Sequence, residues 1–223
     1  IDGNNFDNLE LWTPQFSNPY YKKIKSEIKK KYELIEIRKI KKKLIKYKEP
    51  GSDFYLNSLE KTDTDIPFIR TSDYFNYELD PNPDYFIEES SGKQFLKDLK
   101  DGDLIITKDG KIGNIAIIFK SQKYILSAGS IVLRVKKEIN PYYIFLCISS
   151  GYIGQNFLKQ RTVIASTIPH LKVSRFEDIE IPIIKTEKMN KLGSIVKKAY
   201  ELKSKRRILM AEIKKKINNY FDY

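Results

Sequence analysis

Cysteine and histidine are nearly absent from this chain of 223 residues, which holds one of each, Cys147 and His170. A single cysteine cannot form a disulfide within the chain, so we expect a buried, unreactive thiol in a reducing, cytoplasmic setting. A single histidine excludes metal sites and catalytic pairs built from several histidines. No stretch approaches eighteen consecutive apolar residues, about the minimum for a membrane span, and we expect no signal peptide. The first residue is isoleucine, which indicates an origin inside a longer polypeptide.

The short motifs of common catalytic sites are also missing. No G-x-S-x-G turn offers a serine nucleophile, and no glycine-rich loop has the spacing of a nucleotide-binding motif. Asn-Pro-Tyr-Tyr occurs twice, at 18–21 and 140–143, but it lacks the second proline of the N-P-P-Y/F loop in which adenine methyltransferases hold a flipped base. Both copies have the asparagine and proline of a helix start. We therefore predict no catalytic residue, metal site or cofactor site in this chain.

Positive charge is abundant but uneven. The net charge is +12, and residues 22–48 alone hold thirteen lysines and arginines against three glutamates. Residues 186–223 hold eleven basic against four acidic residues, whereas the span 49–185 is nearly neutral, at −2. Excess positive charge favours a polyanionic partner such as nucleic acid. We expect the neutral middle to contact a polyanion through a few individual residues.

Apolar and chain-breaking residues divide the sequence into the regions 1–53, 54–185 and 186–223. In the first region, apolar residues recur every three or four positions between 20 and 37, which predicts a basic amphipathic helix. In the second region, β-branched runs predict short strands at 66–70, 104–106, 115–119 and 131–135. Short helices are predicted at 142–148 and 155–159. This mixture indicates an α+β domain with short mixed strands, neither a doubly wound sheet nor a helical bundle.

A long helix is predicted for the third region, from Thr186 to about Tyr220. Apolar residues recur there at spacings of three and four, interrupted by Arg206. The members of this stripe are Leu192, Ile195, Ala199, Leu202, Leu209, Ile213, Ile217 and Tyr220. Such a stripe either docks on its own domain or pairs with another helix as a coiled-coil arm. A helix of about 30 residues, roughly 45 Å, favours the arm, because the mean globular helix is about a third of that length.

The stretch 100–119, K-D-G-D-L-I-I-T-K-D-G-K-I-G-N-I-A-I-I-F, predicts two strands joined by the polar loop 107–113. Gly110 and Gly113 allow the loop backbone a positive φ or a close approach to a ligand. Lys108 and Lys111 can point from this loop toward an anion. On pattern alone, the loop is a charged turn between two buried strands.

Several segments, in the right order, carry a resemblance to one family. They are I-P-F-I-R-T-S-D at 66–73, the strand–loop–strand at 100–119, the strand at 127–135, the N-P-Y-Y helix at 140–150 and S-T-I-P-H-L with the strand that follows at 166–184. Together they resemble the target recognition domain in the specificity subunits of type I restriction–modification systems. The sequence departs from that family at 183–188, where the proline and glutamine of its hinge are missing. A full specificity subunit has two such domains, and this chain has one.

The resemblance implies a sequence-specific, double-stranded-DNA-binding module with a helical arm. It implies partners that methylate and cleave, namely DNA methyltransferase and restriction subunits or domains, which would hold S-adenosylmethionine, ATP and Mg²⁺. A homodimer through the C-terminal helix is a further expectation. The polar residues implied to face DNA are Arg70, Thr71, Ser72, Lys108, Asp109, Lys111, Gln155, Lys159, Gln160, Arg161, Thr162, Ser166, Thr167, His170 and Lys172.

Two alternatives stay open at this point. The chain is the recognition domain of a fused methyltransferase–endonuclease, or it is a basic interaction or RNA-binding protein. His170 has an alternative role as a structural histidine beneath the turn that precedes it. Four aromatic residues are expected in the core: Trp12, Tyr124, Phe145 and Phe157.

Overall fold

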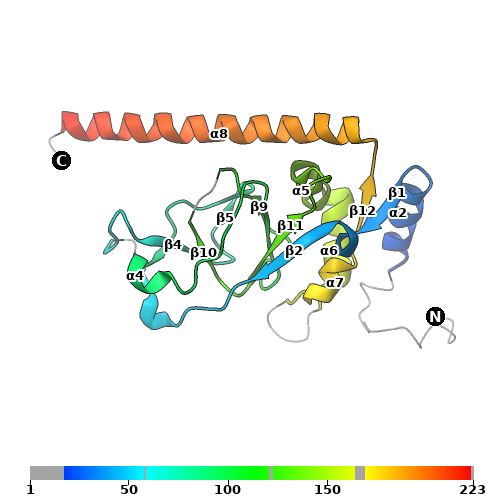
Figure 1. Cartoon of the computed structure of the whole chain (residues 1–223), viewed down its shortest axis with the longest axis horizontal. Helices are drawn as coiled ribbons and strands as arrows, with labels where there is room; N and C mark the ends of the chain where they lie inside the picture. Colours follow the sequence, from blue (N-terminus) through cyan, green and yellow to red (C-terminus); the bar gives the residue numbers. More distant parts are fainter. Residues whose placement is uncertain (1–17, 58, 121–122, 164–168, 222–223) are drawn as a thin grey trace.

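The computed structural model describes residues 18–57, 59–120, 123–163 and 169–221. They form a body of short helices and strands with one long helix along its side (Figure 1). This is the α+β architecture that the sequence predicts. Within these ranges, no helix is both long and apolar enough to cross a membrane.

A four-stranded antiparallel sheet forms the centre of the body. Its strands lie in the order β2 (Lys41–Lys46), β11 (Ser130–Val135), β8 (Leu104–Thr107) and β9 (Ile115–Ile117). Side chains alternate between the two faces of a strand, so Leu104 and Ile106 join one core cluster and Ile105 joins another. Both faces of β8 are therefore covered, and all four of its residues are buried.

A second sheet packs on one face of the first. Its strands lie in the order β10 (Ile125–Leu126), β4 (Ile66–Ile69), β7 (Tyr85–Ile87) and β3 (Leu56–Asn57), with β10 parallel to β4. Ile69 and Leu126 share a buried cluster with Ile105 and Val132 of the central sheet. A small hairpin, β5 (Tyr74–Phe75) and β6 (Glu78–Leu79), follows β4 in sequence. The two sheets and this hairpin position the loops described below.

Helices and one further strand pair cover the opposite face of the central sheet. The helices are α2 (Pro19–Lys29), α3 (Ile37–Ile40), α5 (Pro141–Ser149), α6 (Asn156–Arg161) and α7 (Val173–Glu177), and the strands are β1 (Glu33–Glu36) and β12 (Glu180–Ile183). A π-helical turn, η3 (Gly151–Gln155), joins α5 to α6. Elsewhere lie a 3-10 turn, η2 (Ser52–Phe54), and a short helix, α4 (Glu89–Gly92). Asn140 caps α5 by accepting from the backbone N–H of Tyr142 (3.0 Å), as its Asn-Pro start predicts.

The basic helix expected over 20–37 is too long, because α2 ends at Lys29. Residues 33–36 form β1 instead, with Ile35 opposite Ile181 of β12. The hydrogen bonds and apolar contacts of this long-range pair outweigh the helical spacing of the local sequence. Through α2, β1 and β2, the region before residue 53 is part of the main core, in which Ile24 and Ile28 are buried.

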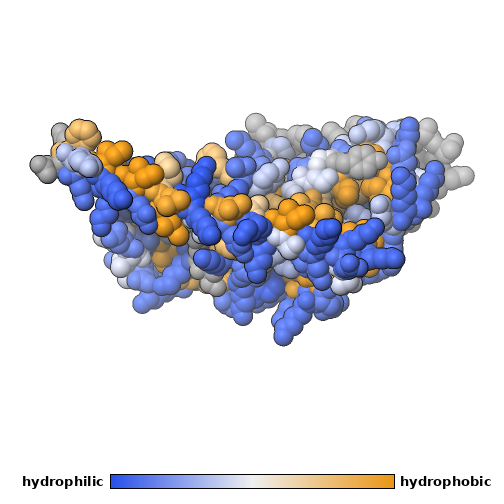
Figure 2. Space-filling model, turned by 90° about the horizontal axis from the view of Figure 1, so that it is seen from above, coloured by the Kyte–Doolittle hydropathy of each residue, from blue (hydrophilic) through white to orange (hydrophobic). Residues whose placement is uncertain are grey.

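The long helix, α8 (Thr186–Tyr220), has 35 residues and begins at the residue predicted from the sequence. It packs against α5 through Met189, Gly193, Val196 and Tyr200, its four buried residues. The apolar stripe predicted from the sequence is not this docked face. Every member of that stripe is exposed: Leu192, Ile195, Ala199, Leu202, Leu209, Ile213, Ile217 and Tyr220. Figure 2, which looks onto this side, shows a broken line of apolar side chains along the molecule.

Three of the residues expected in the core are buried, namely Tyr124, Phe145 and Phe157. The fourth, Trp12, lies outside the described residues. Cys147 is buried, as predicted, and burial raises the pKa of its thiol to about 11. A raised pKa keeps the thiol protonated and unreactive at neutral pH.

Candidate nucleic-acid interface

The loop 107–113 between β8 and β9 is closed by hydrogen bonds at its base. Thr107 and Asn114 pair through their backbones, with the N–H of Thr107 donating to Asn114 O (2.9 Å). The Thr107 hydroxyl accepts from the N–H of Asn114 (3.0 Å) and donates to Lys111 O. Gly110 and Gly113 have φ values of +68° and +87°, which explains the two glycines of the sequence. The loop therefore has a defined shape before any ligand binds.

Two other segments hold this loop from either side. The backbone N–H of Lys108 donates to Gly129 O (2.8 Å), in the turn that precedes β11. The N–H of Gly110 donates to Pro169 O (3.1 Å), and the N–H of Leu171 donates to Lys108 O (2.8 Å). Main-chain bonds thus join the loop to the segment 169–171, about 60 positions further along the chain.

A third segment, the turn after β4, reaches the same place. A Cβ atom on Gly129 would lie 2.7 Å from Thr71 Cγ2, so Thr71 lies against the turn that holds the loop. The buried carboxylate of Asp73 closes the 70–73 turn by accepting from the N–H of Arg70 (2.9 Å) and from the Ser72 hydroxyl (2.7 Å). We call the surface formed by residues 70–73, 107–113, 128–130 and 169–172 the loop edge.

Charges on the loop edge are partly neutralised. The Asp109 carboxylate pairs with Lys108 Nζ (2.5 Å) and is hydrogen-bonded to His170 Nδ1. Lys111 and Lys172 are exposed and form no ion pair with any described residue. Asp109 therefore fixes two side chains, while Lys111 and Lys172 stay available to an anion. His170 is half exposed on this surface, with 50% of its side chain accessible, so it is not a buried structural histidine.

The sequence of the chain matches a known protein family. A family model, the type I restriction modification DNA specificity domain, matches residues 23–219. The chain belongs to this family. The match confirms the resemblance drawn from the sequence and the prediction of a DNA-specificity component. No curated protein matches the sequence.

Solved structures share the fold of this specificity domain at low sequence identity. The HsdS subunit from Thermoanaerobacter tengcongensis has a TM-score of 0.54 and 11% identity, over 85% of this chain and 45% of that chain. The S subunit of a type I restriction-modification system from M. genitalium has a TM-score of 0.52 and 17% identity, over 91% of this chain and 49% of that one. The type IIG restriction endonuclease BpuSI has a TM-score of 0.57 and 10% identity, over 82% and 28%. The specificity domain thus spans about half the length of the first two proteins.

The residues between 155 and 167 that were implied to face DNA mostly form contacts within the specificity domain. Gln155 Nε2 donates to Gly113 O (3.0 Å) and so stabilises the loop at its C-terminal end. Arg161 donates to Asp178 O (3.2 Å), and burial lowers the pKa of its guanidinium below the ordinary value. The Thr162 hydroxyl donates to Leu158 O (2.8 Å). Gln160 accepts from Arg161 (3.1 Å), whereas Lys159 is exposed; Ser166 and Thr167 lie outside the described residues.

Arg70 is also engaged within the specificity domain. Its guanidinium donates to Asp84 (2.7 Å) and lies over the ring of Tyr85, 4.5 Å from the centroid. Asp84, its partner in this ion pair, is exposed, with 80% of its side chain accessible. A contact between Arg70 and a phosphate would therefore replace a solvent-screened ion pair.

Two lysines near the loop edge were not predicted from the sequence as site residues. Lys46 is opposite Ile131, and Lys48 follows it beside the Gly129 turn, where Glu49 accepts from the N–H of Ala128 (2.6 Å). Only the register between β2 and β11 brings these residues to the loop edge, and local sequence does not encode that register. They belong to the basic span 22–48, and the register brings part of its positive charge next to the loop.

Proposed function

We propose that this specificity domain is a non-catalytic reader of double-stranded DNA that places the loop edge in the major groove. The observation that carries the proposal is the convergence of four segments, distant in sequence, on one hydrogen-bonded surface. Base edges in the major groove present donor and acceptor patterns that polar side chains distinguish. A surface held by main-chain bonds loses little conformational entropy when it binds such a pattern.

The exposed side chains of the loop edge divide into two roles. Ser72 and His170 offer hydrogen-bonding groups suited to base edges. Lys111 and Lys172 supply unpaired positive charge suited to phosphates. Asp109 holds His170 and Lys108 in place between them. Gln155, Arg161 and Thr162 support this surface, since their side chains form hydrogen bonds within the protein.

Methylation and cleavage belong to partners in this proposal. DNA methyltransferase and restriction subunits would bind S-adenosylmethionine, ATP and Mg²⁺, and this chain would direct them to its site. Family membership supports the division of labour. Among the described residues, no cluster of three histidine, cysteine or acidic side chains is placed to hold a metal ion.

The exposed stripe of α8 is proposed as the contact between two copies of the chain. Apolar residues at spacings of three and four form a seam suited to another helix. Leu192, at one end of the stripe, also lines an apolar hollow of about 350 Å³ together with Tyr32 and Leu146. The seam from 192 to 220 is about 42 Å long, slightly more than the 34–36 Å of one DNA turn, so a pair of arms would set the distance between two half-sites.

Sequencing of the methylome tests this function. Cells that carry the gene with its methyltransferase partner should show one methylated motif that disappears when the gene is deleted. Cells that instead carry a gene for the variant Lys111→Gln with Lys172→Gln should show reduced methylation of the same motif and no new methylated motif. An unchanged set of methylated motifs after deletion would contradict the proposal.

A further inference from the structure

Three basic residues of the N-terminal region are neutralised by acidic partners. Lys25, Arg38 and Lys41 form ion pairs with Glu180, Asp178 and Glu177, which tie α2, α3 and β2 to the β12 side of the body. The lysines further along β2 and just after it are exposed and form no ion pair with any described residue: Lys42, Lys43, Lys46 and Lys48. Unneutralised charge therefore lies along β2 and at its end, in addition to the exposed lysines of α2 and of the turn that follows it, which are also unpaired among the described residues.

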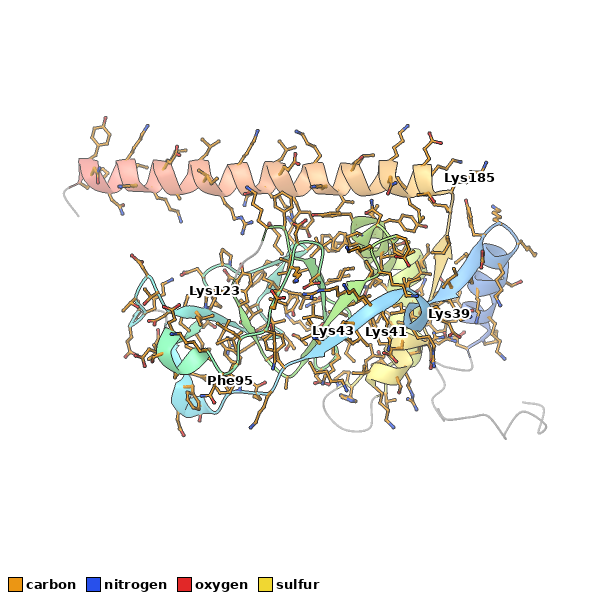
Figure 3. All side chains as sticks on the ribbon, viewed as in Figure 1. Lys39, Lys41, Lys43, Phe95, Lys123 and Lys185 are labelled. Carbon is orange, nitrogen blue, oxygen red and sulfur yellow. The ribbon has the colours of Figure 1, made fainter. Side chains whose placement is uncertain are left out.

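Figure 3 shows Lys39, Lys41 and Lys43 following one another along α3 and β2 across the body. Beyond them, the strand continues toward the loop edge. β2 is antiparallel to β11, and β11 is antiparallel to β8, with Ser130 opposite Thr107. The end of β2 and the start of the 107–113 loop thus lie at the same end of the sheet.

The strand order gives the distance across the sheet between the end of β2 and the start of the loop. β11 lies between β2 and β8, so two strand spacings separate Lys46 from Ile106, the residue before the loop begins at Thr107. Two spacings are about 10 Å. The major groove of DNA is about 12 Å wide and is bounded by the phosphate backbones. With the loop in the groove, the end of β2 lies over a bounding backbone.

We propose that Lys46 and Lys48 bind the phosphate backbone that flanks the groove entered by the loop edge. The inference rests on the proposed DNA-reading function and adds a sequence-independent contact to it. Lysine suits this role as a flexible point charge that approaches a phosphate from several directions. These two lysines fix the position of the loop on the duplex, and the loop edge discriminates among base pairs.

A different role for lysines on β2 is protection of a sheet edge. β2 is an outer strand, and exposed lysines on outer strands prevent pairing with another chain. Edge protection predicts that removing the charges causes self-association and leaves DNA affinity unchanged. Phosphate binding predicts the opposite pattern.

The test compares two double variants that remove the same charge at opposite ends of the sheet. One is Lys46→Gln with Lys48→Gln. The matched control is Lys136→Gln with Lys137→Gln, directly after β11 ends, where both lysines are exposed and unpaired among the described residues. Binding to a random-sequence duplex, and to a duplex bearing the motif recovered by selection, is measured from low to high salt by fluorescence anisotropy.

The β2 variant should lose affinity for both duplexes by the same factor, roughly fivefold to tenfold per lysine near 0.1 M salt. The slope of log affinity against log salt should fall in magnitude by about 2, and the preference for the motif should not change. The control should lose much less. A third variant, Lys46→Arg with Lys48→Arg, keeps the charge and should keep the slope, which separates charge loss from misfolding.

Equal losses in the β2 variant and the control would overturn the inference, since they would reflect net charge alone. Self-association of the β2 variant with unchanged affinity would also overturn it. A wild-type chain that binds the motif while the β2 variant binds equally well contradicts only this inference. A wild-type chain without motif preference contradicts the proposed function itself.

Discussion

Asp109 connects two loops that are 61 residues apart in sequence, because its carboxylate is hydrogen-bonded to His170 Nδ1. The same carboxylate pairs with Lys108, and main-chain bonds reinforce the connection on both sides. The pair lies at the centre of the loop edge, so its disruption should affect DNA reading more than it affects folding.

Replacement of Asp109 by alanine tests this separation. Its side chain is 30% accessible and that of His170 is 50% accessible, so solvent screens this pair and the free energy of unfolding should fall by about 1 kcal/mol. Affinity for the selected motif should fall at least roughly tenfold, since His170 and Lys108 are no longer held. Asp98→Ala is the control, because Asp98 pairs with Lys100 (3.2 Å) on the surface away from the loop. Similar affinity losses in both variants would count against a reading role for Asp109.

The two lysines of the loop should differ in their effects. Lys111 is exposed and unpaired among the described residues, whereas the Lys108 side chain is only 16% accessible and pairs with Asp109. Lys111→Ala should reduce the magnitude of the salt slope of DNA binding by about 1, and Lys108→Ala should reduce it less. Salt titrations of binding measure both. Identical slopes for Lys111→Ala and wild type would exclude a phosphate contact by Lys111.

Gly193 sets how closely α8 approaches the body. A Cβ atom there would lie 2.7 Å from Asn140 Cγ, and Asn140 is held in place as the cap of α5. Gly193→Val should lower the free energy of unfolding by about 1–3 kcal/mol. The neighbouring Ser194→Val is the control, since Ser194 is exposed, and it should change stability by less than about 0.5 kcal/mol. Urea denaturation compares the two, and equal stabilities would contradict the close packing.

The arm should self-associate through its exposed stripe. Leu202 and Leu209 are 56% and 57% exposed, so their replacement by glutamate costs the isolated chain little stability. The double variant should sediment as a monomer at concentrations where the wild type is a dimer. Glutamate at Lys198 and Lys205, two exposed positions outside the stripe, provides the control. A wild-type chain that stays monomeric up to high micromolar concentration would exclude pairing of two copies.

Cys147 should react slowly in the folded protein. Burial raises the pKa of its thiol to about 11, so the fraction of thiolate is small below that pH. At pH 9 the unfolded chain, with a cysteine pKa of about 8.5, is mostly thiolate. Labelling with a thiol reagent at pH 9 should therefore be fast in urea and at least tenfold slower without it. Equal rates would show that the thiol is accessible.

Much of the fold follows from local patterns. The β-branched runs that became β8 and β9 are buried on both faces, and such runs are typical of covered strands. The spacing in α8 predicted a helix from Thr186, but it did not reveal which face docks. That choice depends on Gly193 and on its fit against Asn140, which lies far away in the sequence.

The features that could not be predicted from the sequence depend on contacts between residues far apart in the chain. The segment 33–36 continues the helical spacing of α2, and only its partner β12 makes it a strand. The residues of the loop edge were predicted through a family resemblance, because nothing local joins Thr71, Asp109 and His170. Lys46 and Lys48 were missed for the same reason, since the β2–β11 register brings them to the loop.

Selection from a randomised pool of duplex DNA tests the central claim most directly. The chain is incubated with the pool, bound duplexes are amplified and sequenced, and the variant Asp109→Ala with Lys111→Ala is treated in parallel. The account predicts one enriched motif for the wild type and weak or no enrichment of it for the variant. No enriched motif for the wild type, or equal enrichment by the variant, would contradict DNA reading by the loop edge.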